Sequence, residues 1–147
     1  MKITPRRLRP WLLILAVVAL ALPAAASAAV SSWSGKGDND ATVKVTFNKH
    51  GGPNPYVNNF QISNMLYKPR TTCGFRSGVN LGTIRMSINA NGKFSFHGDA
   101  NQNGIHYHAD VTGKFETKRR ATGHVTETRT SSSGTCTASE DWTAHKQ

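Results

Sequence analysis

Three histidines and an aspartate in the second half of the chain have the spacing of a metal site. His106, His108 and Asp110 occupy alternate positions of a predicted strand over residues 105–117, and alternate residues of a strand point to the same face of a sheet. A preceding strand that ends at His97 would place a third imidazole beside them if the two strands form a hairpin. Imidazole and carboxylate groups are typical ligands of zinc and copper. The alternative is a solvated strand face on which histidine is merely tolerated.

A calcium-binding pattern overlaps these residues. Asp99, Asn101 and Asn103 stand at alternate positions, Gly104 follows, and Asp110 lies six residues after the glycine. This is the order of oxygen ligands in a calcium loop, with aspartate in place of the final glutamate. The same residues also suit a polar hairpin connection, and a positively charged chain with few acids would bind calcium weakly. We therefore expect no resident cofactor, with a zinc, copper or calcium ion as the alternative.

A group of basic residues surrounds one predicted turn. Lys114, Lys118, Arg119 and Arg120 form this group, and such clusters contact phosphate and other anions. Proteins that bind single-stranded nucleic acids also expose aromatic side chains for stacking, whereas most Phe and Trp side chains here are needed in the core. We interpret the group first as a solubilising surface, with an anion-binding surface as the alternative. We do not expect a nucleic-acid partner.

The first 28 residues have the three parts of a secretory signal peptide. Basic residues up to Arg9 precede an apolar stretch over residues 11–22, and a run of small residues leads to Ala28. An uncleaved membrane anchor is the alternative, because residues 11–30 could just span a bilayer. We predict cleavage after Ala28, which leaves residues 29–147 as one secreted domain. Cleavage removes four of the 18 basic residues, and with eight acids the formal charge falls from +10 to about +6.

The chain has two cysteines, Cys73 and Cys136, and both lie in the predicted exported part. An isolated pair of cysteines outside the cytoplasm indicates a disulfide. Two free thiols are the alternative. In the chain-entropy model, a disulfide that closes a loop of this size stabilises the folded state by about 4 kcal/mol, less any strain.

Alternating apolar residues predict an all-β domain of seven or eight strands. After residue 30 no segment has the sustained apolar repeat of a helix. Predicted strands cover residues 42–47, 57–66, 83–89, 93–97, 105–117, 121–130 and 137–146. Short strands at this spacing favour a small antiparallel sandwich or barrel. The Asn91-Gly92 pair predicts a tight turn that joins residues 83–89 and 93–97 in a hairpin.

Short motifs towards the C-terminus follow a recognisable order. They are Gly113-Lys114-Phe115, Gly123-His124-Val125, Cys136 and Trp142-Thr143-Ala144. A Gly-x-Phe strand, a Gly-x-Val strand, a cysteine and a terminal Trp-x-Ala strand in this order resemble a group of small secreted β-sandwich proteins common in actinobacteria-like genomes, and Trp33-Ser34-Gly35 resembles their opening strand. The resemblance implies a fold and export but no activity. The chain departs from the group in one place, because five residues separate Cys136 and Trp142 where the group has six.

No pattern in the sequence indicates catalysis. The chain has neither a nucleophile elbow nor a helix-borne metal motif, and its carboxylates are scattered. We therefore predict a secreted or envelope-associated module that binds a ligand or has a structural role and is not an enzyme. Its partner would be anionic cell-envelope material or another protein. The alternatives are a small metal-binding protein that uses the histidines described above and a secreted enzyme inhibitor.

Overall fold

The computed structural model describes residues 30–48 and 54–147, and the predicted signal peptide lies outside them. The described residues form eight strands, with a short 3-10 turn over Asp38–Asp40. The strands are β1 (Val30–Gly37), β2 (Thr42–Asn48), β3 (Tyr56–Leu66), β4 (Arg76–Ser87), β5 (Lys93–Gln102), β6 (Ile105–Phe115), β7 (Arg120–Ser131) and β8 (Gly134–Lys146). The structure confirms the predicted all-β class.

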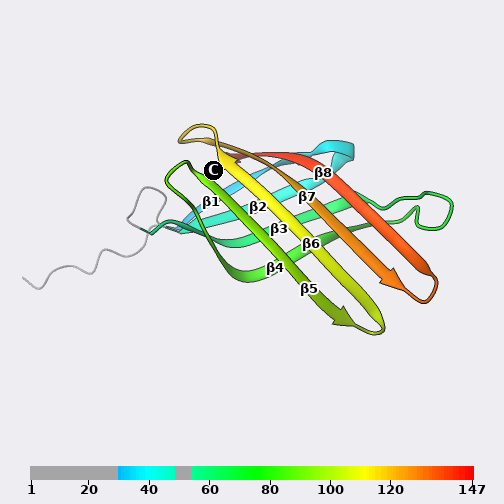
Figure 1. The fold of residues 1–147 in the computed structure, drawn as a ribbon. Coiled ribbons are helices and arrows are strands. Elements are labelled where there is room, and N and C mark those ends of the chain that lie inside the picture. The colour runs from blue at the N-terminus through cyan, green and yellow to red at the C-terminus, as the bar shows by residue number, and fades with distance from the viewer. Residues whose placement is uncertain (1–29, 49–53) are drawn as a thin grey trace, which may run out of the picture.

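All eight strands belong to one antiparallel sheet that curls until it is nearly closed (Figure 1). The strand order is β4-β3-β2-β1-β8-β7-β6-β5. Strands β1 to β4 form one meander and β5 to β8 form a second, and the pairing of β1 with β8 joins the two. Strands β4 and β5 are therefore the two edges of the sheet. One curled sheet corresponds to the barrel alternative rather than to a sandwich of two separate sheets.

The hairpin predicted at Asn91-Gly92 is wrong, although its turn is present. Gly92 has a φ of 72°, and the Asn89 N–H donates to the carbonyl of Lys93 at 2.9 Å. The flanking strands do not pair with each other, because β4 pairs with β3 and β5 pairs with β6. The Asn-Gly step thus specifies the local reversal of the chain, whereas the long-range ladders decide where the two strands go.

Aromatic side chains fill the interior of the curled sheet. Phe47 packs edge-on against Trp33 with ring centroids 5.2 Å apart, and Phe60 lies 5.6 Å from Trp142. All four side chains are buried. Two glycines make room for such rings, because a Cβ at Gly113 or at Gly123 would collide with the ring of Phe94 or of Trp142. Burial of these rings supplies much of the hydrophobic stabilisation of so small a domain.

The segment between β3 and β4 is tied to β8 by a covalent bond and by backbone pairing. Cys73 and Cys136 form the predicted disulfide, with Cα atoms 5.8 Å apart. Lys68 and Thr137 exchange two backbone hydrogen bonds of 2.9 and 3.0 Å. Strand β8 itself pairs with β7 over its whole length, with Trp142 opposite Gly123. The spacing between Cys136 and Trp142 is one residue shorter than in the group that the chain resembles, and the ladder of the last strand is nevertheless unbroken.

Residues 30–48 and 54–147 contain no helix with the length and hydrophobicity that a membrane span requires.

Removal of the disulfide should destabilise the domain. We expect the double variant Cys73→Ser, Cys136→Ser to lose up to about 4 kcal/mol of unfolding free energy, because the denatured chain regains the freedom of the closed loop. Urea denaturation followed by tryptophan fluorescence measures this difference, with the reduced wild-type protein as the control. An unchanged denaturation midpoint would contradict a stabilising role of the crosslink.

Candidate metal centre

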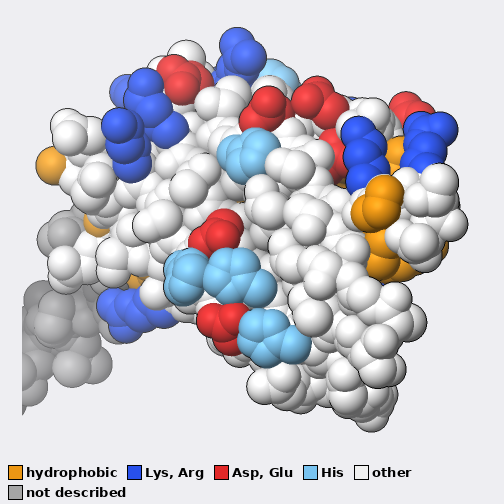
Figure 2. Space-filling view, turned by 45° about the vertical axis from the view of Figure 1, so that its right-hand side comes forward, with side chains coloured by type: hydrophobic (Ala, Val, Ile, Leu, Met, Phe, Trp, Pro, Cys, Tyr) orange, Lys and Arg blue, Asp and Glu red, His pale blue; other side chains and the backbone are white. Residues whose placement is uncertain are grey.

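The register of β5 and β6 gathers five chemically active side chains on one patch of the outer sheet face. His97 lies opposite Asp110, and Asp99 lies opposite His108. His106 stands two residues before His108 and therefore points to the same side. Figure 2 shows histidine and acidic side chains in contact on this face. We name these five residues, His97, Asp99, His106, His108 and Asp110, the His–Asp cluster.

Asp110 holds two of the imidazoles in place. Its Oδ1 accepts a hydrogen bond from His97 Nδ1 at 2.6 Å, and its Oδ2 accepts one from His108 Nε2 at 3.0 Å. An ionised carboxylate only accepts hydrogen bonds, so both of these ring nitrogens carry a proton. The hydrogen bond from His97 lowers the pKa of Asp110 below its usual range. The opposite nitrogens, His97 Nε2 and His108 Nδ1, face away from Asp110.

Asp99 contacts one ring nitrogen of His108 and one of His106. Its Oδ1 lies 2.9 Å from His108 Nδ1 and 3.2 Å from His106 Nε2. The hydrogen bonds to Asp99 and then to Asp110 raise the pKa of His108, and the bond from His108 lowers the pKa of Asp99. Without a metal, His108 is thus a proton-bearing imidazole between two carboxylates. The proton between His108 Nδ1 and Asp99 Oδ1 is the one that a metal ion would displace.

The spacing of the donor atoms approaches that of a zinc site. His97, Asp99 and His108 can each offer one ligand atom so that all three atoms lie within 4.8 Å of one another. Metal–ligand distances of about 2.0–2.1 Å place the donors of a tetrahedral zinc site roughly 3.3 Å apart. The two contacts of Asp99 Oδ1 with His106 and His108 already have this length. His97 has the most exposed side chain of the cluster, at 68%.

The structure does not form a calcium loop at Asp99. Asp99 to Gln102 continue β5 and pair with residues 105–108, so only Asn103 and Gly104 make the turn, both with positive φ. A calcium loop instead wraps its oxygen ligands around the ion in an irregular conformation. Most polar residues of the calcium-binding pattern therefore lie in strands, and the side chain of Asp99 faces the histidines.

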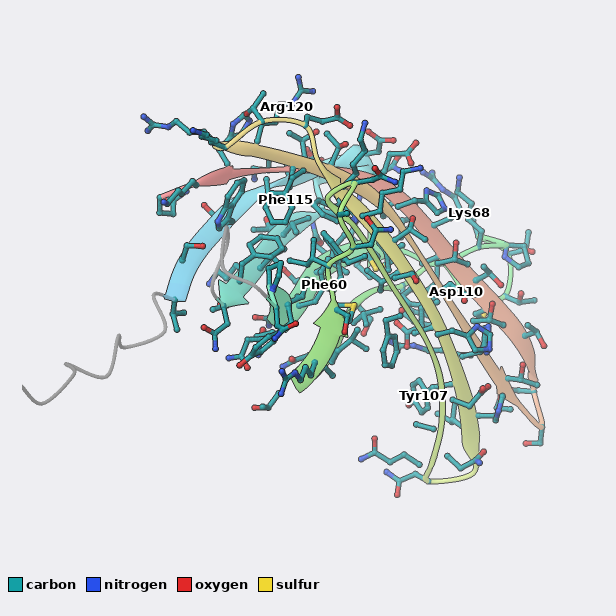
Figure 3. The ribbon with its side chains drawn as sticks, turned by 60° about the vertical axis from the view of Figure 1, so that its left-hand side comes forward. Phe60, Lys68, Tyr107, Asp110, Phe115 and Arg120 are labelled. Atoms are coloured by element: carbon teal, nitrogen blue, oxygen red, sulfur yellow. A yellow bond between two sulfur atoms is a disulfide. The ribbon has the colours of Figure 1, made fainter. Side chains whose placement is uncertain are left out.

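The predicted basic group lies elsewhere. Lys114 is on the outer face of β6, where its ammonium is 3.5 Å from Glu116. Lys118 and Arg119 lie in the turn between β6 and β7, and Arg120 begins β7. Figure 3 shows Arg120 at the end of the molecule opposite Tyr107. The basic group therefore does not extend the His–Asp cluster.

A second histidine site on the outer face was not singled out from the sequence. His124 donates from Nδ1 to Asp141 Oδ1 at 2.7 Å, and Ser139 Oγ donates to His124 Nε2 at 2.9 Å. This is the order of groups in a serine nucleophile relay. The side chains of His124 and Asp141 are 47% and 75% exposed, so water surrounds the relay on an open strand face.

A buried charged group inside the sheet was not predicted from the sequence. Glu127 accepts hydrogen bonds from Arg129 and from the hydroxyl of Tyr67. Burial, followed by the bond to Glu127, raises the pKa of Tyr67, which keeps its phenol protonated. The alternation of β7 could have predicted these inward charges. Glu127 and Arg129 follow Val125 at intervals of two residues, so they share its inward face. The position of Tyr67 had no such signal, because this residue lies outside the strands.

Comparisons with protein-family models, with curated protein sequences and with solved structures find no match for this chain.

Proposed function

We propose that this protein is an exported binding protein that holds one zinc or copper ion on the outer face of β5 and β6. The ligands would be His97, Asp99, His106 and His108, and Asp110 would orient two of the imidazoles. The observation that carries the proposal is the convergence of three histidines and two aspartates from two adjacent strands on one patch of the sheet.

The donor set favours zinc or copper over calcium. Three imidazole nitrogens suit borderline metals such as Zn²⁺ and Cu²⁺, whereas calcium takes six to eight oxygen ligands. His106, whose Nε2 lies 3.2 Å from Asp99 Oδ1, would add a fourth ligand to His97, Asp99 and His108 and complete a tetrahedral coordination shell, which is typical of a structural or storage site. A catalytic zinc site keeps one position open for water or substrate. The ligand count thus supports a binding role.

The contacts of Asp110 support the proposal independently of the ligands. A metal-bound histidine usually donates its other ring N–H to a carboxylate or a carbonyl, which fixes the tautomer and the ring orientation. Asp110 makes this contact with both His97 and His108. A metal ion would therefore meet two imidazoles that already present the correct nitrogen.

Two features support a location outside the cytoplasm. Disulfides such as Cys73–Cys136 are typical of proteins in oxidising compartments. The residues before position 29 have the pattern of a signal peptide. An exported binding protein is also compatible with the positive formal charge of the chain, which favours anionic surroundings. The proposed metal site would then be loaded outside the cell.

Zinc binding should be stoichiometric and should depend on His108. We expect isothermal titration of the metal-free protein with zinc to give one site. Loss of a residue that only hydrogen-bonds to a ligand typically weakens metal affinity by roughly 10–100-fold. The variant His108→Ala should weaken zinc affinity by more than this, because it removes a ligand. The matched control is His124→Ala, which removes an outer-face histidine with its own carboxylate partner. Equal affinity of wild type and His108→Ala would refute the site.

Replacement of Asp110 should weaken metal binding without abolishing it. We expect Asp110→Asn to retain one zinc per chain but to bind it about 10–100-fold more weakly, because the amide no longer fixes the histidine tautomers as an anion does. Competition with a zinc chelator measures the change. If the stoichiometry falls to zero instead, Asp110 is itself a ligand.

Metal affinity should fall as the pH is lowered. Protons compete with the metal for His108 Nδ1, and the raised pKa of His108 means that this competition begins above the ordinary histidine pKa of about 6.5. We expect the apparent zinc affinity to rise with pH through the neutral range and to level off once His108 has lost its proton. Titrations at a series of pH values test this, and an affinity that does not change across the neutral range would argue against histidine ligands.

A further inference from the structure

A cavity of about 490 Å³ opens into the interior between the two edge strands of the sheet. Its walls come from β4, β5, β6 and β7, and β4 and β5 do not pair across it. The volume lies within the range of small-molecule sites, which in β folds often occupy the mouth of a closed sheet. At about 30 Å³ each, on the order of fifteen non-hydrogen atoms would fill it.

The cavity is lined by apolar and polar side chains in similar measure. Val79, Leu81 and Phe96 contribute apolar side chains. The charged lining residues are Arg129, Glu127 and Asp99, and both carboxylates already have partners, Glu127 in Arg129 and Tyr67 and Asp99 in the histidines. An apolar wall with a few convergent polar groups is the usual composition of a site for a small organic ligand. The composition alone does not choose between acids, alcohols and amines.

Several contacts hold Arg129 in the wall of this cavity. Its Nε and Nη2 donate to the two oxygens of Glu127 at 3.1 and 3.3 Å, and Nη2 also donates to Ser77 Oγ at 2.9 Å. The guanidinium lies 4.4 Å from the ring centre of Tyr67 and 5.3 Å from that of Tyr107. Within residues 30–48 and 54–147, Nη1 has no hydrogen-bond acceptor.

Stability does not explain why the charged pair is inside the sheet. Glu127 is 5% exposed, and a buried ion pair is often no more stable than apolar side chains of the same volume. Glu127 is fully engaged by Arg129 and by the Tyr67 hydroxyl. The N–H groups of Nη1 are thus the part of the pair that is available to another molecule, and an anionic acceptor would bind them most strongly.

We propose that the cavity binds a small organic acid, with its carboxylate on Arg129 Nη1 and its apolar body against Phe96, Leu81 and Val79. The cavity borders the His–Asp cluster, whose side chains contact one another on the outer face. Asp99 is shared by the two regions, since it contacts the histidines and also borders the cavity. Zinc is therefore omitted from the binding measurements.

Three probes of equal chain length test the recognition chemistry. Octanoate, 1-octanol and octylamine are titrated into the metal-free protein, and binding is followed by tyrosine and tryptophan fluorescence and by calorimetry. A charge-assisted hydrogen bond contributes about 1.5–3 kcal/mol, so octanoate should bind roughly 10–100-fold more tightly than octanol. Octylamine should bind most weakly. Equal affinities for the three probes, or no binding of octanoate at millimolar concentration, would overturn the proposal.

Two variants locate the binding. Glu127→Gln combined with Arg129→Gln removes both charges together, so that neither is left buried alone, and it should abolish the preference for octanoate over octanol. Ala100→Trp adds a bulky side chain at an exposed residue that borders the cavity, and it should weaken octanoate binding about tenfold or more by excluding part of the ligand. Thr135→Trp adds the same bulk on the outer face of β8 and should leave binding unchanged. Unchanged octanoate affinity in Ala100→Trp would place the ligand elsewhere and refute the proposed cavity.

Discussion

The hydrogen-bond ladders of the nearly closed sheet decide which residues face inward and which face outward. Because side chains alternate along each strand, one register fixes the environment of every residue of that strand. In β6 this places Ala109 and Val111 in the core while His108 and Asp110 face outward. The metal site proposed on the outer face and the ligand cavity proposed inside the sheet both depend on this alternation.

The two faces impose different electrostatic conditions on similar side chains. In the His–Asp cluster, the carboxylates of Asp99 and Asp110 remain in contact with water and stabilise a proton on His108. Inside the sheet, Glu127 has no such contact with solvent and takes its hydrogen bonds from Arg129 and Tyr67. In the proposed metal site the outer group would exchange its proton for a metal ion, whereas the inner group is a buried ion pair that keeps its partners. Each face is suited to a different kind of ligand.

Much of the fold and part of the candidate site follow from local patterns. The predicted strands at residues 57–66 and 105–117 match β3 and β6 closely, because alternation is a property of a few neighbouring residues. The disulfide was predicted from the presence of two cysteines in a chain with a predicted signal peptide. The Asn91-Gly92 hairpin was wrong because a turn signal does not specify which strands pair. No strand was predicted for residues 76–82, although they begin β4.

The sequence by itself determined the strand type of most segments and the shared face of His106, His108 and Asp110, since both depend only on the geometry of an extended chain. Tertiary structure decided the strand order, the separation of β4 from β5, and the meeting of Tyr67 with Glu127 and Arg129. These features arise from competition among all the strands for partners and for interior volume. Contacts of this kind join residues that are far apart in the chain, and no local pattern encodes which of them will meet.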